Sequence, residues 1–410
     1  MSERIVRTRA GTLRVRVDGP HRAPVLVLAS SLGTTLEMWD PQVPRLAGFL
    51  RVVRYDHRGH GGSSTPEGPY TIEDLGDDLV TLLDALEVEQ AAVCGISLGG
   101  MAAMWAAASR PERISAIVVA CTAAVLGPKE TWYERAAIVR RGGTMPLLAS
   151  LVQRWFPPGV PDARPELVDA VGAMLRRCDA EGYAACCAAI AEMDLRPLLG
   201  RISAPALVVA GAHDPVTPPS TGLSLAQDLR AGLLVLPGSS HLASLTEPDA
   251  FAEAVLGHVV GDPGRRGAAV RREVLGADHV ARAAAHRDPL SRDFVDLVTR
   301  YAWGEVWSRP GLDRRTRSAV TLALLVALGR AEELSFHVDA ALRNGLTAEE
   351  VRETLLHCAV YTGAPAVRAA LQVVRDALDS AAGDDGGTAG DDGPDDRAAP
   401  GHGSDRPHPG

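Results

Sequence analysis

The chain has 410 residues, of which 46% are hydrophobic and 23% are charged, and this composition is typical of folded globular domains. Its length exceeds the needs of one ordinary domain and allows two or three. The net charge of −9 gives no basic surface, so we expect no nucleic-acid partner.

The cysteines and the apolar runs bear on the cellular compartment of the protein. Six cysteines are present, none forms a CxxC pair, and most lie in apolar segments. This usage is typical of a reduced, cytoplasmic protein. Residues 1–10 carry charges and no apolar core, so we expect no signal peptide. No apolar run reaches the ~18 residues of a membrane span, so we expect no membrane partner.

Short apolar runs alternate with helical patterns through the first two-thirds of the chain. Runs typical of strands lie at residues 12–17, 24–29, 51–55, 91–94, 114–120, 205–210 and 233–236. This alternation predicts an α/β fold with a mostly parallel sheet that is covered by helices on both faces. The period becomes helical from residue 123 to about residue 197, which predicts a helical lid inserted into this domain.

The run at residues 91–94 leads into Gly95-Ile96-Ser97-Leu98-Gly99, and a helical pattern follows at once. A strand that turns directly into a helix strains the backbone of the turn residue, and side chains two positions away on either side would collide. The two glycines avoid that collision. The pattern therefore predicts a nucleophile elbow that exposes the hydroxyl of Ser97 at a helix N-terminus.

A serine nucleophile needs a base, and the base needs a carboxylate that orients it. Asp214 and His241 each follow a late apolar strand, and the ends of parallel strands share the sheet edge where Ser97 is expected. The chain order Ser97, Asp214, His241 suits this fold. We expect the oxyanion hole to be formed by the backbone N–H groups of Leu98 and Leu32. The polar turn at residues 56–63 is interpreted as structural.

Residues 1–262 resemble the α/β-hydrolase superfamily, and Ser97, Asp214 and His241 stand at the positions of its catalytic triad. Within it, Ser31-Leu32-Gly33-Thr34 followed by Trp39-Asp40 is similar to the 3-oxoadipate enol-lactonase family. Thr131-Trp132 and Arg135 at the start of the lid are similar to that family too. The resemblance implies that Trp132 and Arg135 face the carboxylate of the substrate. A lid-packing tryptophan and a solvated arginine are the alternative.

The last third of the chain has a different organisation. Residues 263–267 form a short polar break that is interpreted as a linker, and residues 268–380 are helical throughout, which predicts a separate all-α domain. Thr347 and Glu350 form a capping box before one of these helices. Residues 381–410 are rich in Gly, Asp and Pro, so we expect a disordered acidic tail.

Two pairs of polar residues stand at helical i, i+4 spacing in this all-α part, namely Glu333 with His337 and His357 with Tyr361. The stretch from residue 300 to residue 370 resembles the carboxymuconolactone decarboxylase family. The related alkylhydroperoxidases carry CxxCxxxH on this helix, whereas Arg330 and Glu333 stand here at the two cysteine places. A thiol peroxidase is therefore not expected.

The resemblance implies loss of carbon dioxide from a 4-carboxymuconolactone. Such a substrate is its own electron sink, because the electrons move onto the conjugated lactone carbonyl, so no metal, pyridoxal or thiamine cofactor is expected. We expect His337 to donate to the developing oxyanion or to carbon, with Glu333 favouring its charged form. His357 and Tyr361 would shape the pocket, and Arg314 or Arg317 would hold the carboxylates of the substrate.

The two resemblances point to neighbouring reactions, because the decarboxylase product is an enol-lactone. We therefore expect a bifunctional enzyme of aromatic breakdown that acts on small-molecule lactones and forms homo-oligomers through its helical domain. The alternative is a general serine esterase or perhydrolase fused to a helical oligomerisation module without catalytic activity.

Overall fold

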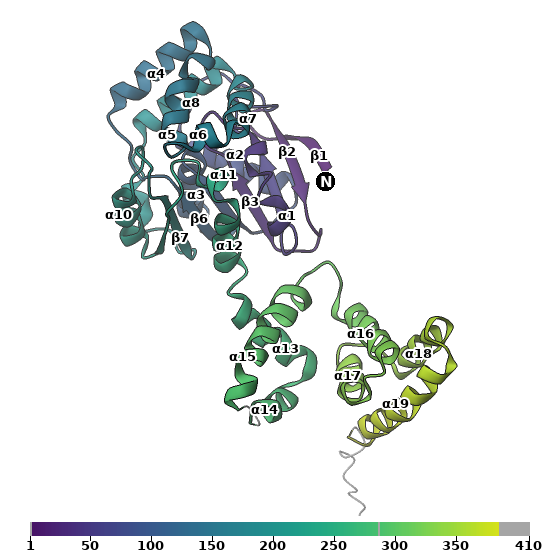
Figure 1. The fold of residues 1–410 in the computed structure, drawn as a ribbon. Helices are drawn as coiled ribbons and strands as arrows, with labels where there is room; N and C mark the ends of the chain where they lie inside the picture. Colours follow the sequence, from purple (N-terminus) through teal and green to yellow (C-terminus); the bar gives the residue numbers. More distant parts are fainter. Residues whose placement is uncertain (1, 286–287, 385–410) are drawn as a thin grey trace, which may run out of the picture. The chain divides into compact units, whose positions relative to one another are not determined.

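The computed structural model describes residues 2–285 and 288–384 (Figure 1). Contacts within the chain define two compact units, of which the first holds Met1–Glu273 and Ala281–Asp313 and the second Val274–Val280 and Arg314–Gly410. The domain boundary expected at residues 263–267 stays a prediction.

The first unit is built on one sheet of eight strands in the order β1-β2-β4-β3-β5-β6-β7-β8. The strands are β1 Ser2–Arg7, β2 Thr12–Asp18, β3 Val25–Ala29, β4 Arg51–Tyr55, β5 Ala91–Ile96, β6 Ile114–Ala120, β7 Ala206–Gly211 and β8 Gly232–Leu236. β1 and β2 run antiparallel to their neighbours, and all other pairs are parallel. The α/β-hydrolase fold is thereby confirmed.

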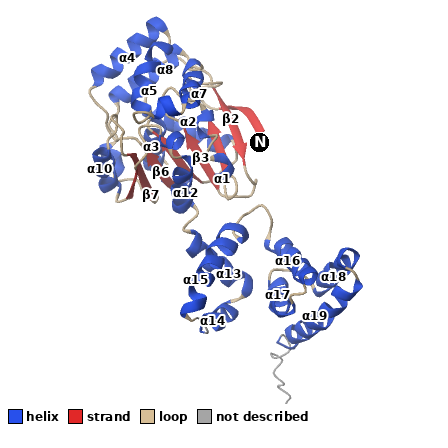
Figure 2. Ribbon diagram, viewed as in Figure 1, coloured by secondary structure: helices blue, strands red, loops and turns tan. Residues whose placement is uncertain are grey.

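The central strands have continuous apolar sequences because both faces of the sheet are covered. Every residue of β4 and β5 is buried. Figure 2 shows the red strands surrounded by blue helices. The helices outside the lid are η1 Leu36–Trp39, α1 Val43–Leu46, α2 Ile72–Ala85, α3 Leu98–Ser109, η2 Pro111–Arg113, α10 Pro219–Leu229, α11 Ala243–Thr246 and α12 Pro248–Val259. The N-terminal strand β1 was not predicted, because its charged sequence lacks an apolar run.

The stretch between β6 and β7 is helical, as expected for a lid. Its helices are α4 Lys129–Gly142, η3 Met145–Leu147, α5 Leu148–Trp155, α6 Val160–Ala163, α7 Pro165–Arg176, α8 Ala180–Glu192 and α9 Arg196–Leu199. Figure 1 shows α4, α5, α7 and α8 gathered at one end of the sheet.

The residues interpreted as a linker, 263–267, are instead the first turn of a helix. The helices that follow α12 are α13 Pro263–Leu275, α14 Ala277–Ala285 and α15 Pro289–Val298, and a π-helix, η4, follows at Thr299–Trp307. Pro263 stands where a helix needs no N–H donor, and the Asp262 carboxylate accepts from the Arg265 N–H at 3.0 Å. Local capping thus starts a helix where composition alone suggested a break.

The second unit is formed by α16 Arg314–Leu328, α17 Ala331–Arg343, α18 Ala348–Thr362 and α19 Ala364–Asp384. Its core includes Leu322, Val338 and Leu355. The capping box predicted at Thr347 and Glu350 starts α18. α19 continues into the first four residues of the expected tail, and the rest of that tail, 385–410, lies outside the described residues. No helix of the described chain is long and apolar enough to cross a membrane.

Candidate functional site

The turn between β5 and α3 has the strained geometry that the GxSxG pattern predicts. Ser97 has φ 53° and ψ −116°. A Cβ on Gly95 would lie 2.2 Å from the Gly99 carbonyl oxygen, and one on Gly99 would lie 2.1 Å from the Ala29 carbonyl oxygen. Neither position tolerates a side chain, so the two glycines allow the turn that presents Ser97.

The structure brings Asp214 and His241 together from the loops after β7 and β8. His241 Nδ1 donates to Asp214 Oδ2 at 2.8 Å, and both side chains are buried. Thr217 also donates to this carboxylate, through its N–H at 3.1 Å and its hydroxyl at 2.7 Å. Burial acts to raise the pKa of Asp214, but His241 and these hydrogen bonds hold that pKa below its usual value. The carboxylate is therefore ionised and orients the imidazole.

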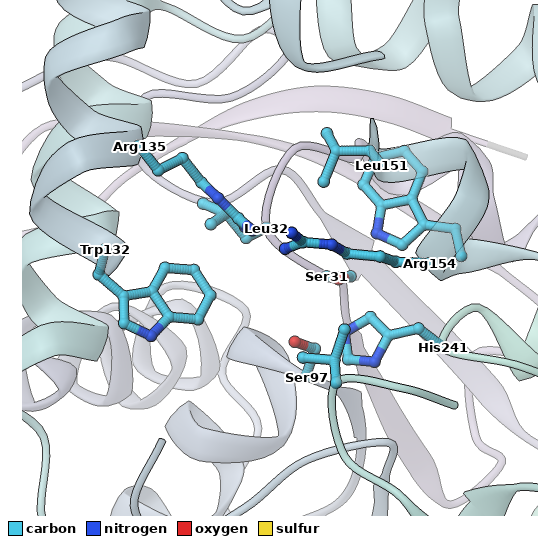
Figure 3. Close-up of a pocket in the computed structure, with 10 residues that line it drawn as sticks. Ser31, Leu32, Ser97, Trp132, Arg135, Leu151, Arg154 and His241 are labelled. Atoms are coloured by element: carbon cyan, nitrogen blue, oxygen red, sulfur yellow. The ribbon is translucent and has the colours of Figure 1, made fainter. Parts of the chain in front are cut away.

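Ser97 and His241 line one pocket, which Figure 3 shows with the side chains around it. The pocket is lined by Ser31, Leu32, Ser97, Trp132, Arg135, Leu151, Arg154, Trp155, Val216 and His241. Leu32 is thus at the pocket, as expected for the oxyanion hole, and Leu98 is the first residue of α3. This arrangement can carry out nucleophilic acyl transfer.

Two buried histidines of the polar turn, His57 and His60, hydrogen-bond to the backbone of the loop that carries Leu32. His57 Nε2 donates to the Ser30 carbonyl at 2.9 Å, and the Gly33 N–H donates to His60 Nε2 at 3.0 Å. Burial lowers the pKa of His60, and burial, with the repulsion that two protonated rings would feel, lowers the pKa of His57 to about 3. Both rings are neutral near pH 7, which suits the structural interpretation of this turn.

Trp132 and Arg135, two residues of α4, both line the pocket. The Trp132 indole N–H donates to the Leu126 carbonyl at 3.1 Å, and the Arg135 guanidinium lies over the indole ring, 4.6 Å from its centroid. Arg154 of α5 lines the same pocket, although nothing in the sequence indicated that it would lie there. No motif marks Arg154, because its neighbours in the pocket come from distant parts of the chain.

In the second unit, His337 lies on α17, beside which His279 of the segment Val274–Val280 is placed. The His337 ring is 4.5 Å from that of Phe336, which is itself 4.8 Å from the ring of His279. Burial and then the charge of His279 lower the pKa of His337 to about 4, although Glu333 acts to raise it. The expectation that Glu333 would keep His337 charged near neutrality is therefore wrong, because Glu333 is exposed and its attraction is weakened by solvent.

His357 and Tyr361 lie together on α18, with their rings 5.2 Å apart. His357 lines an open cavity of ≈ 670 Å³ with Ala319, Val320, Ala323, Glu353 and Thr354. No hydrogen bond or ring contact between described residues joins His337 to His357. Arg314 begins α16 and is exposed, and Arg317 is half-buried one turn later. Of the expected decarboxylase residues, His357 lines the open cavity, whereas His337, Glu333, Tyr361, Arg314 and Arg317 are not among its lining residues.

Comparison with known proteins agrees with these two kinds of site. Residues 24–143 match the alpha/beta hydrolase fold family, residues 178–259 match the TAP-like protein family, and residues 292–376 match the carboxymuconolactone decarboxylase family. The chain belongs to the α/β-hydrolase family in its N-terminal part and to the carboxymuconolactone decarboxylase family in its C-terminal part.

Particular relatives sharpen both assignments. The N-terminal part is 45% identical to 3-oxoadipate enol-lactonase 2 of Acinetobacter baylyi over 237 residues, which are 58% of this chain and 89% of that protein. The C-terminal part is 48% identical to 4-carboxymuconolactone decarboxylase of the same organism over 112 residues, 27% of this chain and 84% of that protein. The enol-lactonase structure from Burkholderia xenovorans superposes with a TM-score of 0.61 at 38% identity, covering 63% of this chain and all of that one (100%). One chain thus fuses homologues of two enzymes.

Proposed function

We propose that this chain catalyses two successive steps of aromatic breakdown. The C-terminal part decarboxylates 4-carboxymuconolactone to the 3-oxoadipate enol-lactone, and the N-terminal part hydrolyses that lactone to 3-oxoadipate. The observation that carries this proposal is the fusion itself. One part resembles a 4-carboxymuconolactone decarboxylase and the other a 3-oxoadipate enol-lactonase, and loss of carbon dioxide from 4-carboxymuconolactone gives that enol-lactone.

For the hydrolysis, the geometry supports a serine mechanism. Ser97 Oγ attacks the lactone carbonyl carbon while His241 takes the hydroxyl proton, and Asp214 stabilises the imidazolium that forms. The backbone N–H groups of Leu32 and Leu98 would hold the oxyanion. The ring C–O bond then breaks, its electron pair leaves on the enolate oxygen, and His241 returns the proton. Water releases the acyl group from Ser97, and the enol becomes the ketone.

The cationic side chain of Arg135 and the aromatic face of Trp132 are proposed to receive the carboxylate of the lactone. Their place in the pocket that holds Ser97 supports this role.

For the decarboxylation, the C–C bond to the carboxylate breaks, carbon dioxide leaves, and the electron pair moves through the double bond onto the lactone carbonyl oxygen. We assign His337 as a neutral hydrogen-bond donor to this oxyanion, and the dienolate then takes a proton at carbon from solvent to give the enol-lactone. The lowered pKa of His337 supports a neutral imidazole near pH 7. Glu333 would orient the ring, Arg314 or Arg317 would hold the carboxylates of the substrate, and His357 and Tyr361 would shape the pocket. No step requires a metal or an organic cofactor, because the substrate accepts its own electrons.

We also propose that the chain forms homo-oligomers through its C-terminal helices and works in the cytoplasm. α16 and α18 expose large apolar side chains, including Leu324, Leu328, Leu356 and Val360, which supports burial against a second copy. All six cysteines are buried free thiols, as suits a reducing compartment.

The test is a coupled assay on the full chain supplied with 4-carboxymuconolactone. In Ser97→Ala, we expect hydrolysis to fall by roughly 10³-fold or more and the enol-lactone to accumulate. In His337→Ala, we expect decarboxylation to fall by about 100-fold while added enol-lactone is still hydrolysed. Ser109→Ala, on the same helix as the elbow, should change neither step.

A Ser97→Ala protein that stalls at 4-carboxymuconolactone would contradict the division of labour between the two parts. The alternative of an esterase fused to an inactive module would instead leave 4-carboxymuconolactone unconsumed by the unmodified chain. The 48% identity to a decarboxylase argues against that alternative.

A further inference from the structure

The lid supplies a second arginine, Arg154, that the mechanism above does not use. Arg154 lines the pocket that holds Ser97 and His241, and it also lines an adjoining cavity of ≈ 290 Å³. Figure 3 shows Arg154 and Arg135 extending toward one another from different lid helices. Two guanidinium groups therefore approach each other above the nucleophile.

Two hydrogen bonds to backbone carbonyls at the end of α5 tie this helix to both neighbours of His241. Ser240 Oγ donates to the Arg154 carbonyl at 2.7 Å, and the Leu242 N–H donates to the Trp155 carbonyl at 3.2 Å. Because the donors of these bonds stand directly before and after His241, they fix the backbone of Arg154 relative to His241. The position of Arg154 is set by the catalytic loop as well as by the lid.

No carboxylate balances the two arginines here. The residues that line the two cavities all belong to the described chain, and none of them is Asp or Glu. The Arg135 guanidinium lies over the Trp132 ring, whereas no hydrogen bond or ion pair joins the Arg154 guanidinium to a described residue. A half-buried cation without a counter-ion favours an anionic ligand, and the planar fork of arginine matches a carboxylate.

We propose that Arg154 is a specificity-determining residue that, together with Arg135, binds a carboxylate on the leaving-group side of the substrate. The leaving-group side is favoured because Arg154 is anchored beside His241, which returns the proton to the leaving oxygen. In the enol-lactone, the carbon that bears this oxygen also bears the CH2–COO⁻ arm. The hydrolase site therefore selects anionic lactones and esters over neutral ones, and this inference rests on the lactone hydrolysis proposed above.

The experiment compares the enol-lactone with its methyl ester, in which the carboxylate is masked, as substrates of the full chain. In Arg154→Met, we expect kcat/KM for the free acid to fall about 10- to 100-fold, mainly through KM, the scale of one lost charged hydrogen-bond pair. The methyl ester should change by less than about threefold. For the free acid, kcat/KM of Arg154→Lys should lie between those of the unmodified chain and Arg154→Met, because lysine keeps the charge but lacks the planar fork of the guanidinium.

Arg141→Met is the matched control, since Arg141 is exposed on α4 and lines neither cavity. It should alter neither substrate's kinetics. Equal losses on both substrates in Arg154→Met, or a preference for the free acid that survives this change, would overturn the role of Arg154. If the unmodified chain hydrolysed neither substrate while still decarboxylating, the lactonase assignment itself would fail.

Discussion

His241 and His337 each lie near a carboxylate, but the carboxylate affects the two imidazoles differently because their surroundings differ. His241 donates directly to the buried Asp214 at 2.8 Å, so the pair acts as one unit. Glu333 is exposed and acts on His337 only through space, where burial and His279 outweigh it. Helical i, i+4 spacing alone does not reveal this difference, because it says nothing about solvent or about α14.

The lowered pKa of His337 predicts the pH dependence of decarboxylation. A neutral imidazole that titrates at about 4 should keep kcat/KM level from pH 8 down to pH 6, with a loss only as the pH approaches 4. His279→Gln removes a charge that disfavours protonation, so the acid limb should move to higher pH. The check is the pH profile of carbon dioxide release by both proteins.

An acid limb near the usual histidine value of 6.5 in the unmodified chain would contradict this prediction. The free energy of unfolding should also fall as the pH is lowered. The unfolded chain binds the proton at a higher pH than the folded chain, so the contribution of His337 is complete above pH 6.5 and is lost as the pH falls toward 4.

The elbow is the element on which the hydrolase site depends. A Cβ at Gly99 would lie 2.1 Å from the Ala29 carbonyl oxygen of the neighbouring strand β3. Because that atom is backbone at the centre of the sheet, it cannot move aside cheaply.

We therefore predict that Gly99→Ala costs about 2–4 kcal/mol of unfolding free energy and abolishes most lactone hydrolysis. Gly200→Ala is the control, since a Cβ there meets nothing within 4 Å. Urea unfolding and lactone hydrolysis would measure both variants. A Gly99→Ala protein with unchanged stability would show that β3 and the elbow are less closely packed than described.

At the scale of the whole molecule, the exposed apolar surface of α16 and α18 bears on assembly. Val360 is 76% exposed and Tyr361 is 77% exposed, and Leu356 of the same helix is exposed too. Several large exposed side chains on one helix favour an interaction surface. Tyr361 and its neighbour His357 on α18 are among the residues expected to form the decarboxylase site, so an interface on this helix would affect that site.

We predict that the unmodified chain sediments as an oligomer at micromolar concentration and that Val360→Asp shifts it toward single chains, because a charge cannot be buried unpaired at the contact. Decarboxylation should fall at least about tenfold while lactone hydrolysis persists. Leu223→Asp is the control, because Leu223 is exposed on α10 of the first unit. Sedimentation as single chains before any substitution would contradict this prediction.

Much of the hydrolase part could be predicted because its signals are local. The apolar runs marked seven of the strands, and the GxSxG spacing marked the elbow that the glycine contacts explain. Asp214 and His241 could be chosen because strand ends of a parallel sheet share one edge. β1 was missed, since its pairing with β2 depends on tertiary contact rather than on an apolar run.

The sequence by itself determined the two families, the order of the strands along the chain and the turn that presents Ser97, because each follows from residue types at fixed spacing. Only the tertiary structure decided that Arg154 lines the pocket of Ser97, that 263–267 is helical and that burial and His279 lower the pKa of His337. These properties arise from burial, capping and charges contributed by segments far apart in the chain. Spacing along one helix or strand cannot encode the solvent exposure that determines which electrostatic effect is larger.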